Sequence, residues 1–209
     1  MRSTASSDRR RQCQAPEPWR DTSGQTIIEA ALVVPLLALI AMGVVELGLE
    51  MRNQHVVNVL SREGSNLISR STTLQDAGTV LLSEETGSVN FSTNSQVILS
   101  VIERDATTGA PNYNTLILYQ RYSFGGTTLA SRLITKGAGA GSFGGAPDYI
   151  ALNPDTDTTL QVTNAPAGVA AEIGASSYVT EVFSTDTLMT TLANWGITVP
   201  TQIYSVSYF

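Results

Sequence analysis

The chain has 209 residues and a formal net charge of −6, a length that allows one globular domain beside a membrane segment. Residues 1–24 carry five basic against three acidic residues, whereas residues 25–209 carry seven basic against fifteen acidic residues. No basic residue follows Lys136, which excludes a nucleic-acid footprint or an anionic-lipid surface there. The only cysteine, Cys13, precedes this acidic part, which must therefore fold without disulfides or thiolate metal ligands.

Residues 1–24 are polar and are predicted to form a disordered flank in the cytoplasm. The three arginines at residues 9–11 are not followed by the apolar residues of a twin-arginine export signal, because Gln12 and Cys13 come next. No apolar run precedes Cys13, which argues against lipidation of its sulfur. We therefore interpret this segment as a basic leader.

An apolar run follows, and its length is that of a membrane helix. Residues 30–45 contain no charge, and a helix from Ile27 to Met51 would span about 37 Å, against a hydrocarbon core of roughly 30 Å. We predict that residues 25–51 span a membrane with the basic leader in the cytoplasm. Pro35 is predicted to bend this helix, because it removes one backbone hydrogen bond.

Carboxylates stand near both ends of the run. Glu29 lies near its start, where a charge within a membrane helix costs about 2.5 to 3.5 kcal/mol and commonly meets a partner. The alternative for Glu29 is a solvated position at the membrane surface. Past the run, Glu46 and Glu50 lie one turn apart, and we interpret them as a solvated helix end in preference to a contact with a partner subunit.

The helix is predicted to continue beyond the membrane. Apolar residues between positions 52 and 70 recur with helical spacing and form one stripe, which indicates an amphipathic continuation. Residues 71–73 end this helix. Residues 74–82 are predicted to form a short second helix, with Thr73 as its amino-terminal cap.

The rest of the chain, residues 71–209, is predicted to be a β-rich domain. Its strands are predicted from apolar or alternating segments between Gly, Pro, Asn and Thr breaks, and these segments are residues 97–104, 116–124, 178–183 and 203–209. We predict an α+β fold in which an antiparallel sheet of about four strands covers the amphipathic half of the helix. Residues 125–174 are too long for a hairpin loop and are expected to be functional or mobile.

Two short patterns suggest ligands but lack the rest of their motifs. Residues 139–144 fit G-x-G-x-x-G, yet Pro147 follows where a dinucleotide site needs a helix. Residues 153–157 offer Asp155 and Asp157 at the spacing of a calcium loop, but the glycine of an EF-hand is missing. A calcium site of another design and an ordinary turn both stay open.

Catalytic chemistry has little support in the sequence. The single histidine, His55, has no serine or cysteine motif placed to use it, so a solvated or interfacial role is the better interpretation. Paired histidines, zinc-ligand spacing and a phosphate loop are all missing. We therefore expect no enzyme activity, no cofactor and no metal centre.

The stretch from Gly24 to Leu37, G-Q-T-I-I-E-A-A-L-V-V-P-L-L, resembles the start of the TadE-like pseudopilins of tight-adherence (Tad, Flp-type) pilus systems, which are type IV pilin-like precursors. The resemblance implies that a prepilin peptidase cuts between Gly24 and Gln25, and that Glu29 serves processing and assembly. Classical pilins favour Phe where this chain has Gln25, and major Flp pilins favour Tyr where it has Ala30. These departures favour a minor pseudopilin.

The resemblance also implies a place in the cell and a set of partners. The chain would be a single-pass inner-membrane protein with its amino terminus in the cytoplasm and residues 71–209 in the periplasm, or on the pilus at the cell surface. Its partners would be other pseudopilins or pilins along the helix, the prepilin peptidase and the inner-membrane Tad assembly platform. Residues 125–174 would be a variable loop, and the protein would support pilus assembly and adhesion.

Two alternatives remain open from the sequence. The chain could stay unprocessed, as a membrane-anchored β domain that binds a ligand or serves adhesion through residues 125–174. It could also be an ordinary secreted protein, because Ala41-Met42-Gly43 has the small-x-small pattern of a signal-peptidase site.

Overall fold

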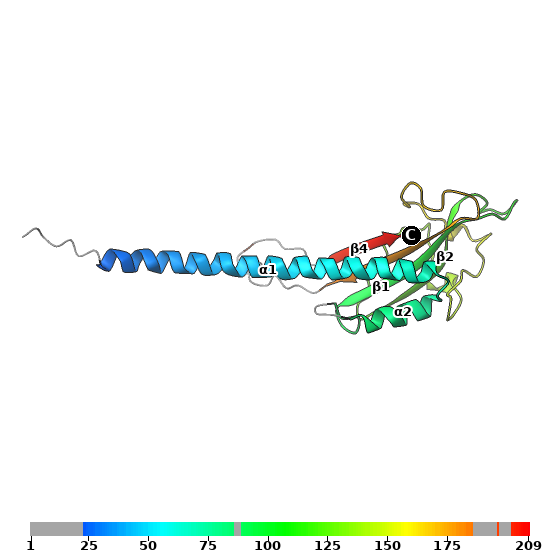
Figure 1. Cartoon of the computed structure of the whole chain (residues 1–209). Coiled ribbons are helices and arrows are strands. Elements are labelled where there is room, and N and C mark those ends of the chain that lie inside the picture. The colour runs from blue at the N-terminus through cyan, green and yellow to red at the C-terminus, as the bar shows by residue number, and fades with distance from the viewer. Residues whose placement is uncertain (1–22, 86–88, 186–195, 197–201) are drawn as a thin grey trace, which may run out of the picture. The chain divides into compact units, whose positions relative to one another are not determined.

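The structure is a computed structural model, and it describes residues 23–85, 89–185, 196 and 202–209. It is an α+β structure with one long helix and a four-stranded sheet, as predicted (Figure 1). The elements in chain order are α1 (Ser23–Ser69), α2 (Leu74–Ser83), β1 (Ser95–Arg104), β2 (Leu116–Gly125), η1 (Ala140–Ser142), η2 (Thr158–Leu160), β3 (Ser176–Ser184) and β4 (Ile203–Tyr208). The chain divides into two compact units, residues 1–42 and 43–209, which are described separately. The predicted leader falls on residues 1–24, of which residues 1–22 lie outside the described part.

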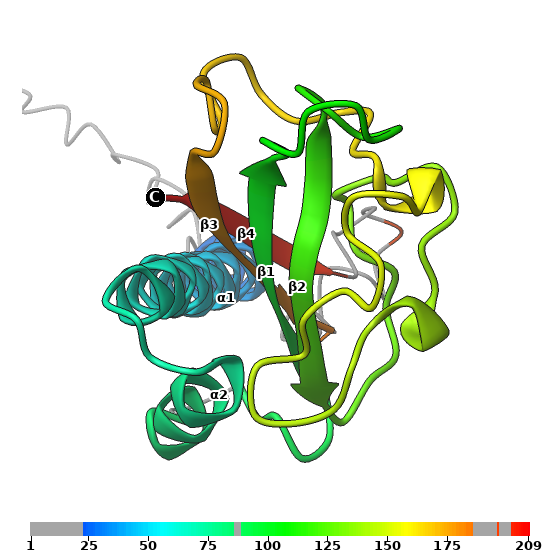
Figure 2. The ribbon, with the colours of Figure 1, turned by 90° about the vertical axis from the view of Figure 1, so that its right-hand side faces the viewer.

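Unit 43–209 is built on an antiparallel sheet with the strand order β2-β1-β3-β4. The register places Leu99 of the inner strand β1 opposite Tyr122 of β2 and Thr180 of β3, so these three side chains share one face of the sheet. Figure 2 shows α1 and α2 against this face, while the insertion between β2 and β3 runs along the outer edge of β2. We call the covered face the helix face and the opposite one the outer face.

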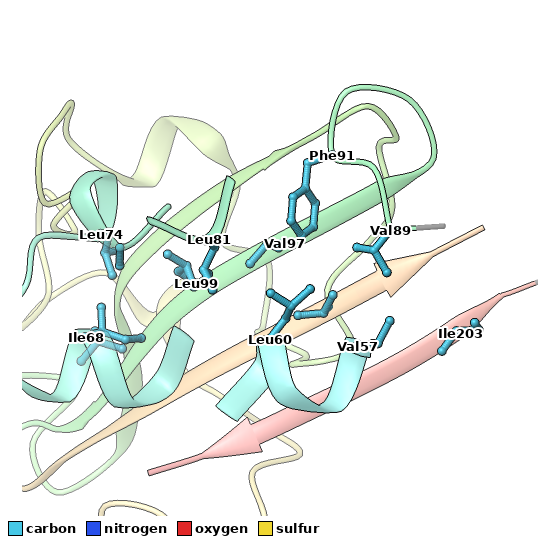
Figure 3. Close-up of a cluster of buried hydrophobic side chains, with 13 residues drawn as sticks. Val57, Leu60, Ile68, Leu74, Leu81, Val89, Phe91, Val97, Leu99 and Ile203 are labelled. Atoms are coloured by element: carbon cyan, nitrogen blue, oxygen red, sulfur yellow. The ribbon is translucent and has the colours of Figure 1, made fainter. Parts of the chain in front are cut away.

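The main core lies between the helices and the helix face (Figure 3). The second half of α1 contributes Val57, Leu60 and Ile68, at the helical spacing that the sequence indicates. Alternate residues of β1 point toward them, because successive side chains of a strand face opposite ways. The other buried members of this core are Leu74, Ala77, Leu81, Val89, Phe91, Val97, Leu99, Val101, Val182 and Ile203.

The short helix α2 begins where its cap predicts. The Thr73 hydroxyl accepts a hydrogen bond from the backbone N–H of Asp76 at 3.1 Å, which satisfies a donor that the first helical turn leaves unpaired. Leu74, Ala77 and Leu81 form the buried face of α2. The predicted cap is therefore confirmed.

Small and polar side chains bring α1 into direct contact with the sheet. The Ser61 and Ser205 hydroxyl oxygens are 2.9 Å apart, and the Ser65 hydroxyl donates to the carbonyl of Ser207 at 2.9 Å. Between them, a Cβ atom added to Gly64 would lie 2.6 Å from the Cγ2 atom of Thr180. This separation is far below van der Waals contact, so α1 reaches β3 and β4 only because position 64 has no side chain.

Replacing Gly64 with Ala should lower the stability of the protein. Helix propensity alone would favour Ala by about 1 kcal/mol, whereas overpacking a buried contact costs about 1 to 3 kcal/mol. We expect a net loss of about 1 kcal/mol, measured by denaturant unfolding of the detergent-solubilised chain. The double variant Gly64→Ala/Thr180→Ala should recover most of this loss, because it removes the side-chain atoms that clash.

Gly48→Ala is the matched control for that experiment. Gly48 also lies in α1, but a Cβ atom there meets no atom within 4 Å. The control should therefore be neutral or stabilising. Equal effects of the two single substitutions would contradict the close-contact explanation.

Candidate functional site

The predicted processing site lies in the first turn of α1. This helix begins at Ser23, so the bond between Gly24 and Gln25 belongs to a turn whose backbone N–H groups have no partner within the helix. Opening this turn for a peptidase would break few hydrogen bonds. A new amino group at Gln25 would stand one helical turn before Glu29.

The first half of α1 has the length and composition of a membrane span. The helix Thr26–Ser69 contains an 18-residue window with a mean hydropathy of 2.5, which is enough to cross a membrane. Its apolar side chains, such as Leu32 and Val34, are exposed within the unit, and Glu29 is exposed on the same helix. The helix continues through Pro35 without interruption, and the bend expected there stays a prediction. An apolar helix of this kind is suited to single-pass anchoring in a bilayer.

The prediction of a solvated helix end after the apolar run is wrong at Glu46. This residue is only 6% exposed, and Asn53, seven residues later, is equally buried. Both lie on the stripe of α1 that continues into Val57 and Leu60, the residues that pack against the sheet. Helical spacing places Glu46 on the buried side. Glu50 is partly exposed, and His55 is exposed.

A buried carboxylate organises the outer face of the sheet. Glu181 lies in the middle of β3 and is 1% exposed. One of its oxygens accepts hydrogen bonds from the backbone N–H of Arg132 at 2.8 Å and from the hydroxyl of Tyr204 at 3.0 Å. The other accepts a short hydrogen bond from the hydroxyl of Ser131. Glu181 thereby fastens residues 131–132 of the insertion to β3 and β4.

Two neighbouring groups complete this network. The Arg121 guanidinium of β2 donates to the hydroxyls of Ser100 at 3.2 Å and Ser131 at 3.1 Å, and burial lowers its pKa. The Arg132 guanidinium carbon lies 3.9 Å from the centre of the Tyr204 ring. Burial and then the nearby Glu181 carboxylate raise the pKa of Tyr204, so its hydroxyl stays protonated and remains a donor.

The insertion, residues 125–174, is a packed part of the domain. The insertion packs against the outer face, where its residues Leu133, Val169 and Ala170 form a buried cluster with Ile102 and Val179. Isolated antiparallel bridges also join it to the outer edge of β2, at Ile117 with Gln161 and at Gln120 with Ile150. These parts of the insertion are therefore packed against the sheet, and the prediction that the insertion is functional or mobile stays a prediction.

The two short sequence patterns form turns in this insertion. Residues 139–144 contain the three-residue η1, followed by a β-bridge at Phe143, so no long helix opens at these glycines. The Asp157 carboxylate accepts from the backbone N–H of Thr159 at 2.9 Å and thereby caps η2. Burial raises the pKa of Glu103, and the nearby charges of Asp105 and then Asp155 raise it further. Among the described residues no group of three or more His, Cys, Asp or Glu side chains is placed to hold a metal ion.

A cavity of about 450 Å³ lies between β2 and the insertion. Its walls are mostly apolar or glycine, and its lining residues are Arg121, Tyr122, Ser123, Ala138, Gly139, Ala140, Phe143, Gly144 and Tyr149. The rings of Tyr122 and Tyr149 stack with centroids 4.5 Å apart. Sequence reasoning missed both this cavity and the Glu181 network, although a carboxylate in the middle of the apolar strand β3 was a visible signal for the network.

Removing the Glu181 carboxylate should release the insertion from the sheet. Glu181→Ala leaves the Tyr204 hydroxyl and the Arg132 N–H without their acceptor, and we expect a loss of about 1 to 3 kcal/mol in unfolding free energy. Glu181→Gln retains one acceptor and should lose less. Trypsin should also cut the Ala variant faster after Lys136, whereas Glu172→Ala, which changes an exposed acid of the same insertion, should resemble the wild type.

The comparisons with known proteins concern the amino-terminal helix. No curated protein and no solved structure matches the chain. The family model described as TadE-like protein matches residues 24–66, which is about a fifth of the sequence and nearly all of α1. The resemblance expected over about residues 23–60 is thus confirmed, and the amino-terminal segment of this protein is TadE-like.

Proposed function

We propose that this protein is a minor pseudopilin of a Tad-type pilus, made as a precursor, processed after Gly24 by a prepilin peptidase and active in pilus assembly and adhesion. The observation that carries the proposal is the TadE-like match to residues 24–66, which coincides with an apolar helix bearing a single carboxylate near its start. The basic leader favours a cytoplasmic amino terminus and a periplasmic sheet domain. The role is structural, through contacts with other subunits and the Tad assembly platform.

The proposed assembly contact is electrostatic. Cleavage would create a positively charged amino group at Gln25, and the Glu29 carboxylate of a neighbouring subunit is its natural partner in a helix bundle. Two unit charges 4 Å apart attract by about 4 kcal/mol at an effective dielectric constant of 20, against about 1 kcal/mol in water. An unpaired carboxylate in the same place would be penalised. The pair therefore favours one axial register between neighbouring helices.

The first prediction concerns the amino terminus of the protein in its native host. Intact mass measurement of the membrane-extracted protein should give a chain that begins at Gln25. A chain that begins at Met1 would support the unprocessed, membrane-anchored binding module instead. A chain that begins at Val44 would indicate secretion after cleavage by signal peptidase, and either result would overturn the pseudopilin proposal.

The second prediction concerns Glu29. Replacing Glu29 with Leu should leave membrane insertion intact, because it makes the span more apolar, yet pilus incorporation should be lost. The measurement is the amount of the variant in membranes and in sheared pili. Glu63→Gln is the control, since Glu63 is an exposed carboxylate of α1 outside the apolar run. Normal incorporation of Glu29→Leu would argue against the pairing role.

A further inference from the structure

We propose that the outer edge of β2 around Ser123 is a docking site for an extended peptide segment of a partner protein, which adds to the sheet as a further strand. The inference concerns unit 43–209 alone. It does not depend on processing after Gly24 or on a role in a pilus.

The sheet order places β2 at one edge, so one side of this strand has no neighbour within the four-stranded sheet (Figure 2). The insertion covers part of that side. Val162 donates to the Leu116 carbonyl at 2.8 Å, Ala151 to the Tyr119 carbonyl at 2.8 Å, and Arg121 donates to the Tyr149 carbonyl at 3.3 Å. These backbone contacts run from the start of β2 to Arg121, and the next outward position is Ser123.

The register shows which backbone groups of β2 point outward. Gly126 donates to the Ser95 carbonyl at 3.0 Å, so the alternate residues Tyr122 and Phe124 also direct their backbone groups toward β1. The backbone N–H and C=O groups of Arg121, Ser123 and Gly125 must then point away from β1. The hydrogen bond from the Arg121 N–H to the Tyr149 carbonyl shows this direction. The exposed Ser123 therefore presents one N–H and one C=O group in the geometry that an antiparallel strand needs.

The cavity of about 450 Å³ lies beside this open stretch of β2. Its size is within the range of about 300 to 1,000 Å³ that is usual for ligand pockets. The small residues Ala138, Gly139 and Ala140 line it and leave room for a backbone, while Phe143 and Tyr149 offer aromatic surface to a side chain. The site thus combines backbone pairing with an apolar pocket, the two elements of peptide recognition by strand addition.

The charge of the site restricts the chemistry of the peptide. Arg121 is the only charged residue that lines the cavity, and its guanidinium is already bonded to Ser100 and Ser131 on the outer face. The pocket therefore offers no free counter-charge of its own. The peptide that fits is an extended segment with an uncharged, apolar or aromatic side chain opposite Phe143 and Tyr149.

The test uses a phage library of random seven-residue peptides, selected on the full-length protein in detergent. Ser123→Pro removes the outward N–H group, and an edge strand tolerates proline where that group does not pair with its neighbour. Ser123→Ala is the matched control, because it changes the side chain and retains the N–H. Thermal unfolding of both variants should confirm that they fold.

Selection on the wild type should enrich peptides with apolar or aromatic residues at alternate positions. The best synthetic peptide should bind Ser123→Ala within about twofold of the wild type and Ser123→Pro at least tenfold more weakly. In the wild type, bound peptide should slow hydrogen exchange of the Ser123 amide and leave that of Tyr122, which faces Leu99, unchanged. This exchange measurement decides the question even if Ser123→Pro does not fold.

Three results would overturn the proposal. The first is a selection that enriches no peptide on the wild type. The second is a peptide that binds a folded Ser123→Pro as tightly as the wild type, which would place binding elsewhere. The third is a bound peptide that leaves exchange at Ser123 unchanged, which would indicate recognition by side chains alone.

Discussion

The domain depends on how closely α1 approaches the sheet. Gly64 sits against Thr180, and two serines of α1 bond to Ser205 and to the carbonyl of Ser207. A larger residue at position 64 would move the helix outward and separate Val57, Leu60 and Ile68 from the apolar residues of β1. Because interiors are packed at the density of organic crystals, this single small residue governs the fit of a whole face of the core.

The outer face is held by polar contacts. Glu181 accepts from the Tyr204 hydroxyl of β4 and from the backbone of Arg132 in the insertion, and it also accepts from Ser131. Burying a carboxylate is costly unless its oxygens are satisfied, and here each oxygen has at least one donor. These hydrogen bonds specify which part of the insertion meets β3, which apolar packing alone would not do.

Elements with a strong local pattern could be predicted from the sequence. The apolar run and its amphipathic continuation predicted α1, and Thr73 predicted the start of α2. The apolar or alternating segments predicted β1 to β4, with each strand end within two residues of its position in the structure. The position of Glu29 on the exposed apolar half of α1 also followed from the sequence. The prediction failed where residues distant in sequence meet. Ser131 and Glu181, which share a hydrogen bond, are 50 residues apart. The burial of Glu46 was missed as well, although Glu46 lies seven residues before the buried Asn53 on α1.

The cavity beside β2 could not be predicted for the same reason. It forms where Ser123 lies beside residues 138–140, 143–144 and 149 of the insertion, and only the folded insertion brings these segments together. Residues 137–141 consist of glycine and alanine, and local composition cannot distinguish a loop from the wall of a pocket. Peptide recognition at an edge strand likewise depends on register, which only the paired strands define.

The insertion joins two neighbours of the inner strand β1, namely β2 and β3, and contacts them both near its ends and along its length. Its middle portion, around η1 and the turn at residues 153–157, is not part of the strand ladder between β1 and β3. The four-stranded sheet is therefore distinct from this part of the insertion. Substitutions in that part can change the exposed surface of the domain without changing the pairing of the four strands.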